Sequence, residues 1–141
     1  MNTKLIISIY ENLKKYVRKK KPSYDIRVTR KSQKIVKDFP LIVMKLDDYP
    51  EIRKTTQGSE SISKAYITIE IFTRDLINGN EKIPDVIVAE ELSELVDKVL
   101  GKMYGMNRTE CKPTPNLDDS IYRITMKYTK NILENKNLLL I

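Results

Sequence analysis

The chain has 141 residues, of which 40% are hydrophobic and 32% charged, and its formal net charge is +7. This length predicts one domain that buries roughly two-thirds of its unfolded surface, and the composition is too apolar for a disordered chain and too charged for a membrane protein. The chain has no histidine and one cysteine, Cys111, which excludes Ser-His-Asp and Cys-His mechanisms, the usual zinc sites and an intrachain disulfide.

The beginning of the chain resembles a secretion signal only briefly. Glu11 and Lys14 interrupt its apolar run, and no small-residue cleavage site follows. No stretch approaches the roughly 18 consecutive apolar residues that a membrane-spanning helix requires. We therefore expect a soluble protein that stays in the cytoplasm where it is made and has no membrane partner.

The positive charge is concentrated in the N-terminal quarter. Residues 1–37 hold twelve Lys/Arg and two acidic residues, a net charge of +10, whereas residues 38–141 hold fourteen Lys/Arg and seventeen acidic residues, a net charge of −3. A basic segment of this kind predicts an anionic partner, either nucleic acid or an acidic protein surface.

Residues 3–20 are predicted to form an amphipathic helix. Apolar residues recur at spacings of three and four, Thr3 is a suitable N-cap, and Pro22 ends the pattern. Basic residues fill the last turns, where cations interact favourably with the helix dipole. The predicted partner-facing patch consists of Lys14, Lys15, Arg18, Lys19, Lys20 and Lys21.

The rest of the chain predicts strands and one more helix. Five segments have the composition or alternation of strands: 24–30, 39–46, 64–74, 107–113 and 121–130. Residues 85–104 carry a second buried stripe of helical period, after a turn at 78–84. The order α-β-β-β-α-β-β predicts a single α+β domain, with a mostly antiparallel sheet of four to five strands and both helices on one face.

Two further segments are candidate interaction surfaces. Residues 47–63 are predicted to be a long polar loop, and loops of this length in compact domains tend to be functional. Its candidate interface residues are Arg53, Lys54, Thr55, Thr56, Gln57, Ser59 and Glu60. The tail from residue 134 ends in an apolar run that we expect to dock on a neighbouring molecule: Leu138, Leu139, Leu140 and Ile141.

Paired carboxylates are the remaining chemical candidates. Asp47-Asp48 and Asp118-Asp119 together have the oxygen ligands that Mg²⁺ prefers. Each pair also lies at the end of a predicted strand beside turn-forming residues, where Asp stabilises turns. We favour the turn interpretation and expect no catalytic residue, no metal ion and no cofactor. A metal-dependent enzyme built on these four residues is the least favoured hypothesis.

Five segments, taken in order, resemble the tail terminator proteins of tailed phages and phage-tail-like particles, also called tail-completion, minor capsid or neck proteins. They are 39–43, 55–56, 66–72, 89–97 and 115–123, the last containing Pro-Asn-Leu-Asp-Asp followed by Tyr-Arg. The resemblance covers about residues 35–130. The basic end of the first helix and the apolar tail have no counterpart in it.

The resemblance implies an α+β subunit that assembles into a closed six-fold ring. Such a ring sits on the last ring of the tail tube, halts tube polymerisation and joins the tail to the neck or head. In contractile particles it also anchors the end of the sheath. The implied partners are copies of the chain itself, the tail tube protein, and a sheath or head-neck connector protein. The main alternative is a small basic nucleic-acid-binding module that uses residues 3–20 and one sheet face.

Overall fold

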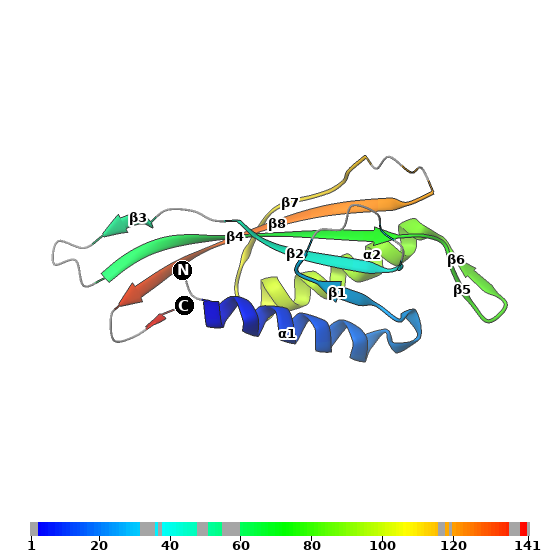
Figure 1. Ribbon diagram of the computed structural model, residues 1–141, viewed down its shortest axis with the longest axis horizontal. Coiled ribbons are helices and arrows are strands. Elements are labelled where there is room, and N and C mark those ends of the chain that lie inside the picture. The colour runs from blue at the N-terminus through cyan, green and yellow to red at the C-terminus, as the bar shows by residue number, and fades with distance from the viewer. Residues whose placement is uncertain are drawn as a thin grey trace.

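The computed structural model describes residues 3–31, 36, 38–47, 51–54, 60–115, 118, 120–135 and 139–140. A sheet lies above two helices, α1 (Thr3–Lys20) and α2 (Asp85–Asp97), so both helices cover the same face of the sheet (Figure 1). The predicted α+β fold, with a mostly antiparallel sheet and two helices on one face, is confirmed.

The two helices form where the apolar spacing predicts them. Leu5, Ile9, Leu13 and Val17 lie on one side of α1 and are buried. Pro22 begins a single 3-10 turn, η1 (Pro22–Tyr24). The second helix continues into a π-helical segment, η2 (Lys98–Met103), so the predicted helix 85–104 is correct in extent. Among the described residues, no helix combines the length and apolar character of a membrane span.

Five strands form the main path of the sheet, in the order β1-β2-β4-β8-β7. They are β1 (Arg27–Thr29), β2 (Leu41–Asp47), β4 (Glu60–Thr73), β7 (Asn107–Pro113) and β8 (Tyr122–Asn135). β4 and β8 each have 14 residues and pair antiparallel along their whole length. β1 and β2 pair parallel, so the expectation of antiparallel neighbours was wrong for this pair: the chain returns to the same end of the sheet before β2 begins.

The prediction of one long loop at 47–63 was wrong, because two strands lie within this segment. β3 (Glu51–Lys54) pairs antiparallel with the beginning of β4, so much of this segment is a strand hairpin. Its Ser, Thr and Gln content predicted a loop, but the long partner β8 supplies hydrogen-bond partners that local sequence does not reveal. On the other side of the ribbon, β9 (Leu139–Leu140) pairs with the end of β8.

These strands form an extension that we call the arm: β3, residues 60–64, residues 131–135 and β9. The arm continues the sheet beyond the first turn of α1 (Figure 1, left). At the other end of the molecule a small hairpin of β5 (Leu76–Asn78) and β6 (Glu81–Ile83) projects from the sheet (Figure 1, right). The turn is shorter than the predicted segment 78–84, because residues 81–83 form a strand. Gly79 has a φ of +66° and allows the chain to reverse direction there.

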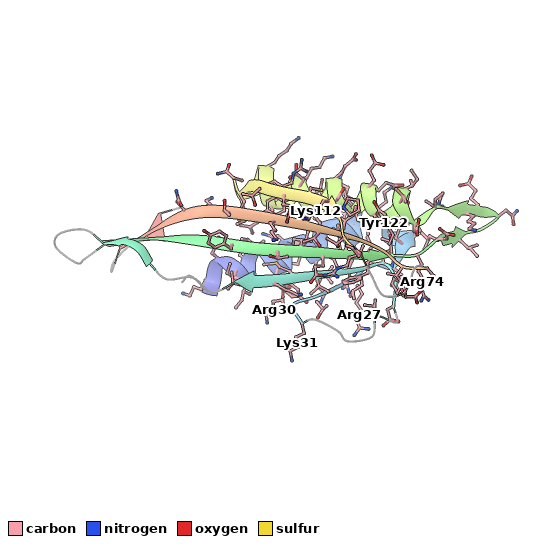
Figure 2. All side chains as sticks on the ribbon, turned by 90° about the horizontal axis from the view of Figure 1, so that it is seen from above. Arg27, Arg30, Lys31, Arg74, Lys112 and Tyr122 are labelled. Carbon is pink, nitrogen blue, oxygen red and sulfur yellow. The ribbon has the colours of Figure 1, made fainter. Side chains whose placement is uncertain are left out.

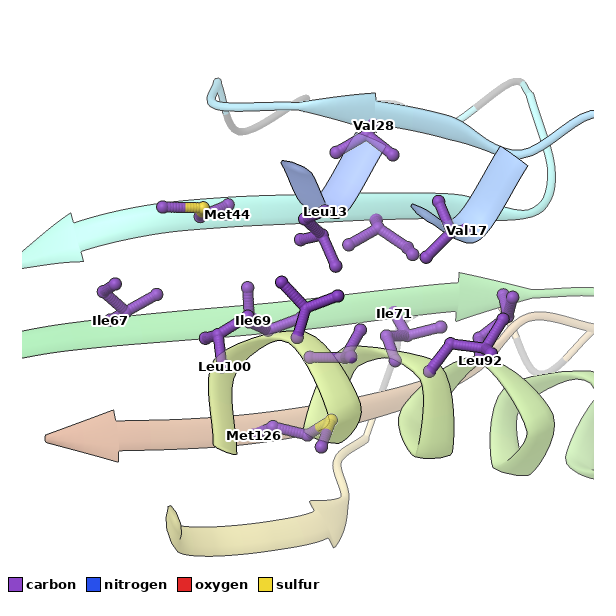
Figure 3. Packing of buried hydrophobic residues seen from close by; sticks show 14 of the residues in the cluster. Leu13, Val17, Val28, Met44, Ile67, Ile69, Ile71, Leu92, Leu100 and Met126 are labelled. Atoms are coloured by element: carbon purple, nitrogen blue, oxygen red, sulfur yellow. The ribbon is translucent and has the colours of Figure 1, made fainter. Parts of the chain in front are cut away.

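The core lies between the helices and the sheet (Figure 3). Leu13 and Leu92 from the helices meet Ile69, Ile71 and Met126 from the strands, and all five are fully buried. The alternation expected of a strand is present in β4, since Ala65, Ile67, Ile69 and Ile71 all belong to this core. A smaller cluster of Leu41, Val43 and Phe72 lies on the opposite face, which we call the outer face.

Candidate assembly surfaces

The predicted basic patch at the end of α1 is partly engaged within the chain. The Nζ of Lys21 lies 2.5 Å from Oε2 of Glu91 in α2, and this hydrogen bond raises the pKa of Lys21. The Tyr24 hydroxyl donates to the same carboxylate at 3.0 Å. Burial, followed by this hydrogen bond, raises the pKa of Tyr24. Lys21 therefore joins the two helices and is not available to a partner.

Three other members of the patch also have contacts inside the chain. Lys14 lies over the ring of Tyr10 at 5.9 Å, and Lys20 lies over the ring of Tyr16 at 5.7 Å. Arg18 donates from Nε to the carbonyl oxygen of Ile26 at 3.3 Å, which ties α1 to the segment before β1. These side chains keep their charge at the surface, but their orientation is set by the fold.

Lys15 and Lys19 complete the patch and differ from the other four. Both are exposed, and neither makes an ion pair or a hydrogen bond through its side chain with the part of the chain that the structure describes. They are one helical turn apart, so they lie on one side of α1. Within the predicted patch, these two lysines are the cations most available to a partner.

The predicted loop interface is placed only in part. Arg53 and Lys54 lie in β3, opposite residues 62 and 61 of β4, and Glu60 is the first residue of β4. The remaining members, Thr55, Thr56, Gln57 and Ser59, lie outside the described residues. The candidate interface is therefore carried by a strand hairpin of the arm, and its role in binding stays a prediction.

The apolar end of the chain is also part of the arm. Leu140 pairs with Leu133 and Leu139 with Glu134, both in β8. Leu138 and Ile141 lie outside the described residues. The backbone of this segment thus pairs with its own chain, and docking on a neighbour stays a prediction.

An ionic cluster on the outer face was not predicted. Glu70, in the middle of β4, has only 3% of its surface exposed, although no helix covers this face. Its two carboxylate oxygens form ion pairs with Lys45 on β2 and Arg123 on β8. The strand order β2-β4-β8 brings these three residues together from positions 25 and 53 apart in sequence. The available signal was weak: Glu70 shares a face of its strand with Tyr66, Thr68 and Phe72.

Charge pairing decides the ionisation of Glu70. Burial alone would raise the pKa of this carboxyl, but the hydrogen bonds from Lys45 and Arg123 outweigh it, and the pKa lies below its usual range. The carboxylate is therefore ionised at neutral pH and holds two cations over the centre of the sheet. This arrangement links three adjacent strands on a face that has few apolar contacts.

A second charged group lies nearer the β7 edge of the outer face. Glu110 on β7 accepts from Lys112 at 2.9 Å and faces Lys127 on β8 at 3.3 Å. Beside it, the Thr114 and Thr125 hydroxyls are 2.9 Å apart and hydrogen-bonded. The outer face is thus crossed by paired charges and hydroxyls, whereas the inner face is apolar.

Basic residues surround the outer face, which bears on the nucleic-acid hypothesis. Figure 2 shows Arg27, Arg30 and Lys31 along one side, Arg74 at one end and Lys112 on the other side. Several of these cations already have partners: Arg27 pairs with Asp38, and Arg74 with Asp118 at 3.2 Å. Arg30 lies over the ring of Tyr10 at 5.2 Å. Paired cations offer less charge to phosphates than an unpaired patch of the same size.

The four carboxylates of the enzyme hypothesis do not converge. Asp47 pairs with Tyr66 in the sheet, whereas Asp118 contacts Arg74, just after the end of β4. Eight residues of extended strand separate these points, a distance of about 25 Å. Asp48 and Asp119 lie outside the described residues. Asp47 and Asp118, the two members that the structure describes, are therefore too far apart to hold one metal ion together.

Asp118 instead confirms the turn interpretation. Its Oδ1 accepts from the backbone N–H of Ser120 at 2.9 Å and from its hydroxyl at 2.6 Å. These hydrogen bonds lower the pKa of Asp118. The pattern is that of a side chain stabilising its own turn. Among the described residues, no group of three or more His, Cys, Asp or Glu is placed to hold a metal ion.

An open groove lies between α1 and the beginning of β1. It has a volume of about 530 Å³ and contains Arg18, Arg27 and Asp38. Arg27 and Asp38 pair with each other across it. The groove is wide and partly neutralised, which suits contact with another surface better than enclosure of a small ligand.

Comparison with known proteins adds no family to these observations. The chain matches no protein-family model, and a search of curated proteins finds no relative.

Proposed function

We propose that this chain is a structural assembly protein whose copies close into a ring that caps the tail tube of a phage or phage-tail-like particle. In this proposal the ring stops tube polymerisation and joins the tube to the neck or head, and in a contractile particle it anchors the sheath end. The subunit assembles in the host cytoplasm and then becomes part of the particle.

The observation that carries this proposal is the arm. β4 and β8 continue together past the helix layer, and β3 and β9 flank them there, so a four-stranded extension projects from one end of the subunit (Figure 1). A projecting sheet presents backbone edges that the body of the domain leaves uncovered. Such an extension suits contact with neighbouring subunits or with the tube.

The opposite end of the subunit presents a different surface. The β5–β6 hairpin projects there, and Ile77 in it is 76% exposed. Val86 and Ile87, in the first turn of α2, are exposed large apolar residues as well. A ring with head-to-tail contacts requires two different surfaces on each subunit, and the two ends of this molecule supply them.

The test is the mass of the purified protein, alone and with tail tubes from the same particle, by light scattering and negative-stain imaging. We expect closed rings in solution, or subunits that become rings at tube ends and stop tube growth. A protein that remains monomeric and ignores tubes would overturn the proposal.

The nucleic-acid hypothesis is tested in the same preparation. Phosphate binding predicts an affinity that falls steeply as salt is raised, because bound counterions are released. Salt-sensitive binding to a DNA or RNA duplex by a protein that ignores tubes would favour that hypothesis over the ring.

A further inference from the structure

The two helices carry opposite charge. Residues Thr3–Lys20 of α1 contain six Lys/Arg and one acidic residue, a net charge of +5. Residues Asp85–Asp97 of α2 contain five acidic residues and no basic one, a net charge of −5. Some of these charges already have partners in the chain: Glu91 pairs with Lys21, just after α1, and Asp97 accepts from Tyr128. Lys15 and Lys19 of α1 and Glu90 and Glu94 of α2 make no ion pair with the described part of the chain.

The exposed side of α1 has a defined order of residue types. Ile7, 43% exposed, is followed at intervals of four by Glu11, Lys15 and Lys19, all exposed. Residues four apart lie on the same side of a helix and about 6 Å apart along its axis. We call these four residues the α1 stripe. In chain order its side chains are apolar, negatively charged, positively charged and positively charged.

The exposed side of α2 and η2 has the complementary order when it is followed backwards. Met103, 56% exposed, is preceded by Lys98, Glu94 and Glu90, all exposed. We call these four residues the α2 stripe. Read against the chain direction, its side chains are apolar, positively charged, negatively charged and negatively charged. The side chains of Glu90 and Glu94 make no ion pair or hydrogen bond within the part of the chain that the structure describes.

We infer that α1 of one copy packs antiparallel against α2 and η2 of a second copy. This alignment places Ile7 by Met103, Glu11 by Lys98, Lys15 by Glu94 and Lys19 by Glu90. Both stripes extend about 20 Å, so the four contacts stay in step. The occupant of each stripe is therefore the other stripe on a neighbouring copy.

This inference rests on the proposed ring and adds a helix contact to the contacts proposed for the two ends of the subunit. Each copy directs α1 to one neighbour and α2 to another, which is the pattern of a head-to-tail contact. Complementary charge fixes the partner and the alignment more than it adds affinity. The exposed apolar ends, Ile7 and Met103, provide the water-excluding part of the contact.

Charge reversal tests the inference. One variant carries Lys15→Glu and Lys19→Glu, and the other carries Glu90→Lys and Glu94→Lys. In each variant alone the two stripes repel, so the protein concentration at half-assembly is expected to rise at least about tenfold. Light scattering gives this concentration, and circular dichroism verifies that each variant is folded.

Mixing the two variants provides the decisive measurement. The first has two acidic stripes and the second has two basic stripes, so an equimolar mixture is expected to assemble in alternation. A chain with all four substitutions is expected to assemble alone. The control matched to the first variant, Lys31→Glu with Lys112→Glu, makes the same change in net charge as that variant but away from both stripes. It is expected to assemble as the wild type does.

Each outcome has one meaning. Wild-type rings that persist in both reversal variants would overturn the helix contact and leave the proposed ring intact. Loss of assembly in the variants without recovery in the mixture would also overturn the contact, because complementary charge would not be its cause. A wild-type protein that forms no ring with or without tubes would overturn both.

Discussion

The two faces of the sheet are buried in different ways. On the inner face, Ile69, Ile71 and Met126 pack under the helices and are fully buried. On the outer face, Glu70 and Thr125 are buried to nearly the same degree without a covering helix. The long side chains of Lys45 and Arg123 pair with Glu70, and the Thr114 hydroxyl is hydrogen-bonded to that of Thr125.

The two faces therefore contribute differently: the inner face mainly stabilises the fold, and the outer face mainly sets the alignment of the strands. Apolar burial on the inner face stabilises the fold through area removed from water and tolerates exchange of similar side chains. The paired charges on the outer face add less net stability, because desolvation offsets much of their attraction. They do require β2, β4 and β8 to align in one register, since a slip by one residue would separate Glu70 from its partners.

The largest expected effect is a cavity in the inner core. Leu92 is fully buried between α2 and the sheet, so Leu92→Ala is expected to lower the free energy of unfolding by about 2–5 kcal/mol. Urea unfolding followed by circular dichroism measures the change. Ile87→Ala, on the exposed side of the same helix, is the matched control and is expected to change stability by less than about 0.5 kcal/mol. Similar losses in both variants would contradict the assignment of the core.

The next effect concerns the outer face. Glu70→Gln removes the charge that pairs with Lys45 and Arg123 and is expected to lower stability by about 1–3 kcal/mol. The lower half of this range is favoured because both cations are partly exposed to solvent. Glu110→Gln, in the more exposed cluster, is the control with a smaller expected loss. Equal losses would mean that burial of Glu70 adds nothing.

The same variant predicts a pH dependence. The pKa of Glu70 is lower in the folded protein than in the unfolded chain, where it is about 4.3. Its contribution is therefore complete above that value and is lost as pH falls through the lower folded pKa. The difference in stability between wild type and Glu70→Gln is expected to be constant from pH 7 to pH 5 and to shrink below about pH 4. A constant difference down to pH 3 would contradict the ion-pair explanation.

A smaller effect is expected at the inner face. The Tyr128 hydroxyl donates to Asp97 at 2.9 Å, and burial, followed by this hydrogen bond, raises the pKa of Tyr128. Tyr128→Phe keeps the ring and removes the donor, so stability is expected to fall by about 1 kcal/mol. Chemical unfolding of Tyr128→Phe, of Asp97→Asn and of the double variant measures the coupling energy between the two side chains. If the double variant loses the sum of the two single losses in stability, the hydrogen bond contributes nothing.

The smallest effect is expected where α1 meets α2. Lys21→Ala removes the ion pair with Glu91, but a side chain that is 36% exposed is screened by water and salt. The expected loss is below about 1 kcal/mol, and it should shrink in high salt. Thermal unfolding in low and high salt measures it. A loss that is independent of salt would point to packing of the Lys21 stem against Tyr24 instead.

The sequence predicted the elements that local periodicity defines. The helix at 3–20 and the strand at 107–113 agree with the structure at both ends. Apolar spacing also predicted that the helix at 3–20 has one apolar side, and Leu13 on that side is fully buried.

Features that depend on distant partners were missed. The first residues of β4 are polar and form a strand because β8 pairs with them on one side and β3 on the other. The cluster at Glu70 needs residues from three strands, and the Lys21–Glu91 pair joins residues 70 apart in sequence. One chain without aligned relatives carries no signal for such contacts, since neither member is unusual at its own position.

The continuous pairing of β4 with β8 has a mechanical consequence. Each strand is about 45 Å long, and neither is interrupted between the helix-covered body and the arm. A load applied to the arm along the strands is therefore carried in shear by the backbone pairs of the whole ribbon, not by a hinge between two parts. We therefore expect body and arm to move together, since the pairing of β4 with β8 has no break between them.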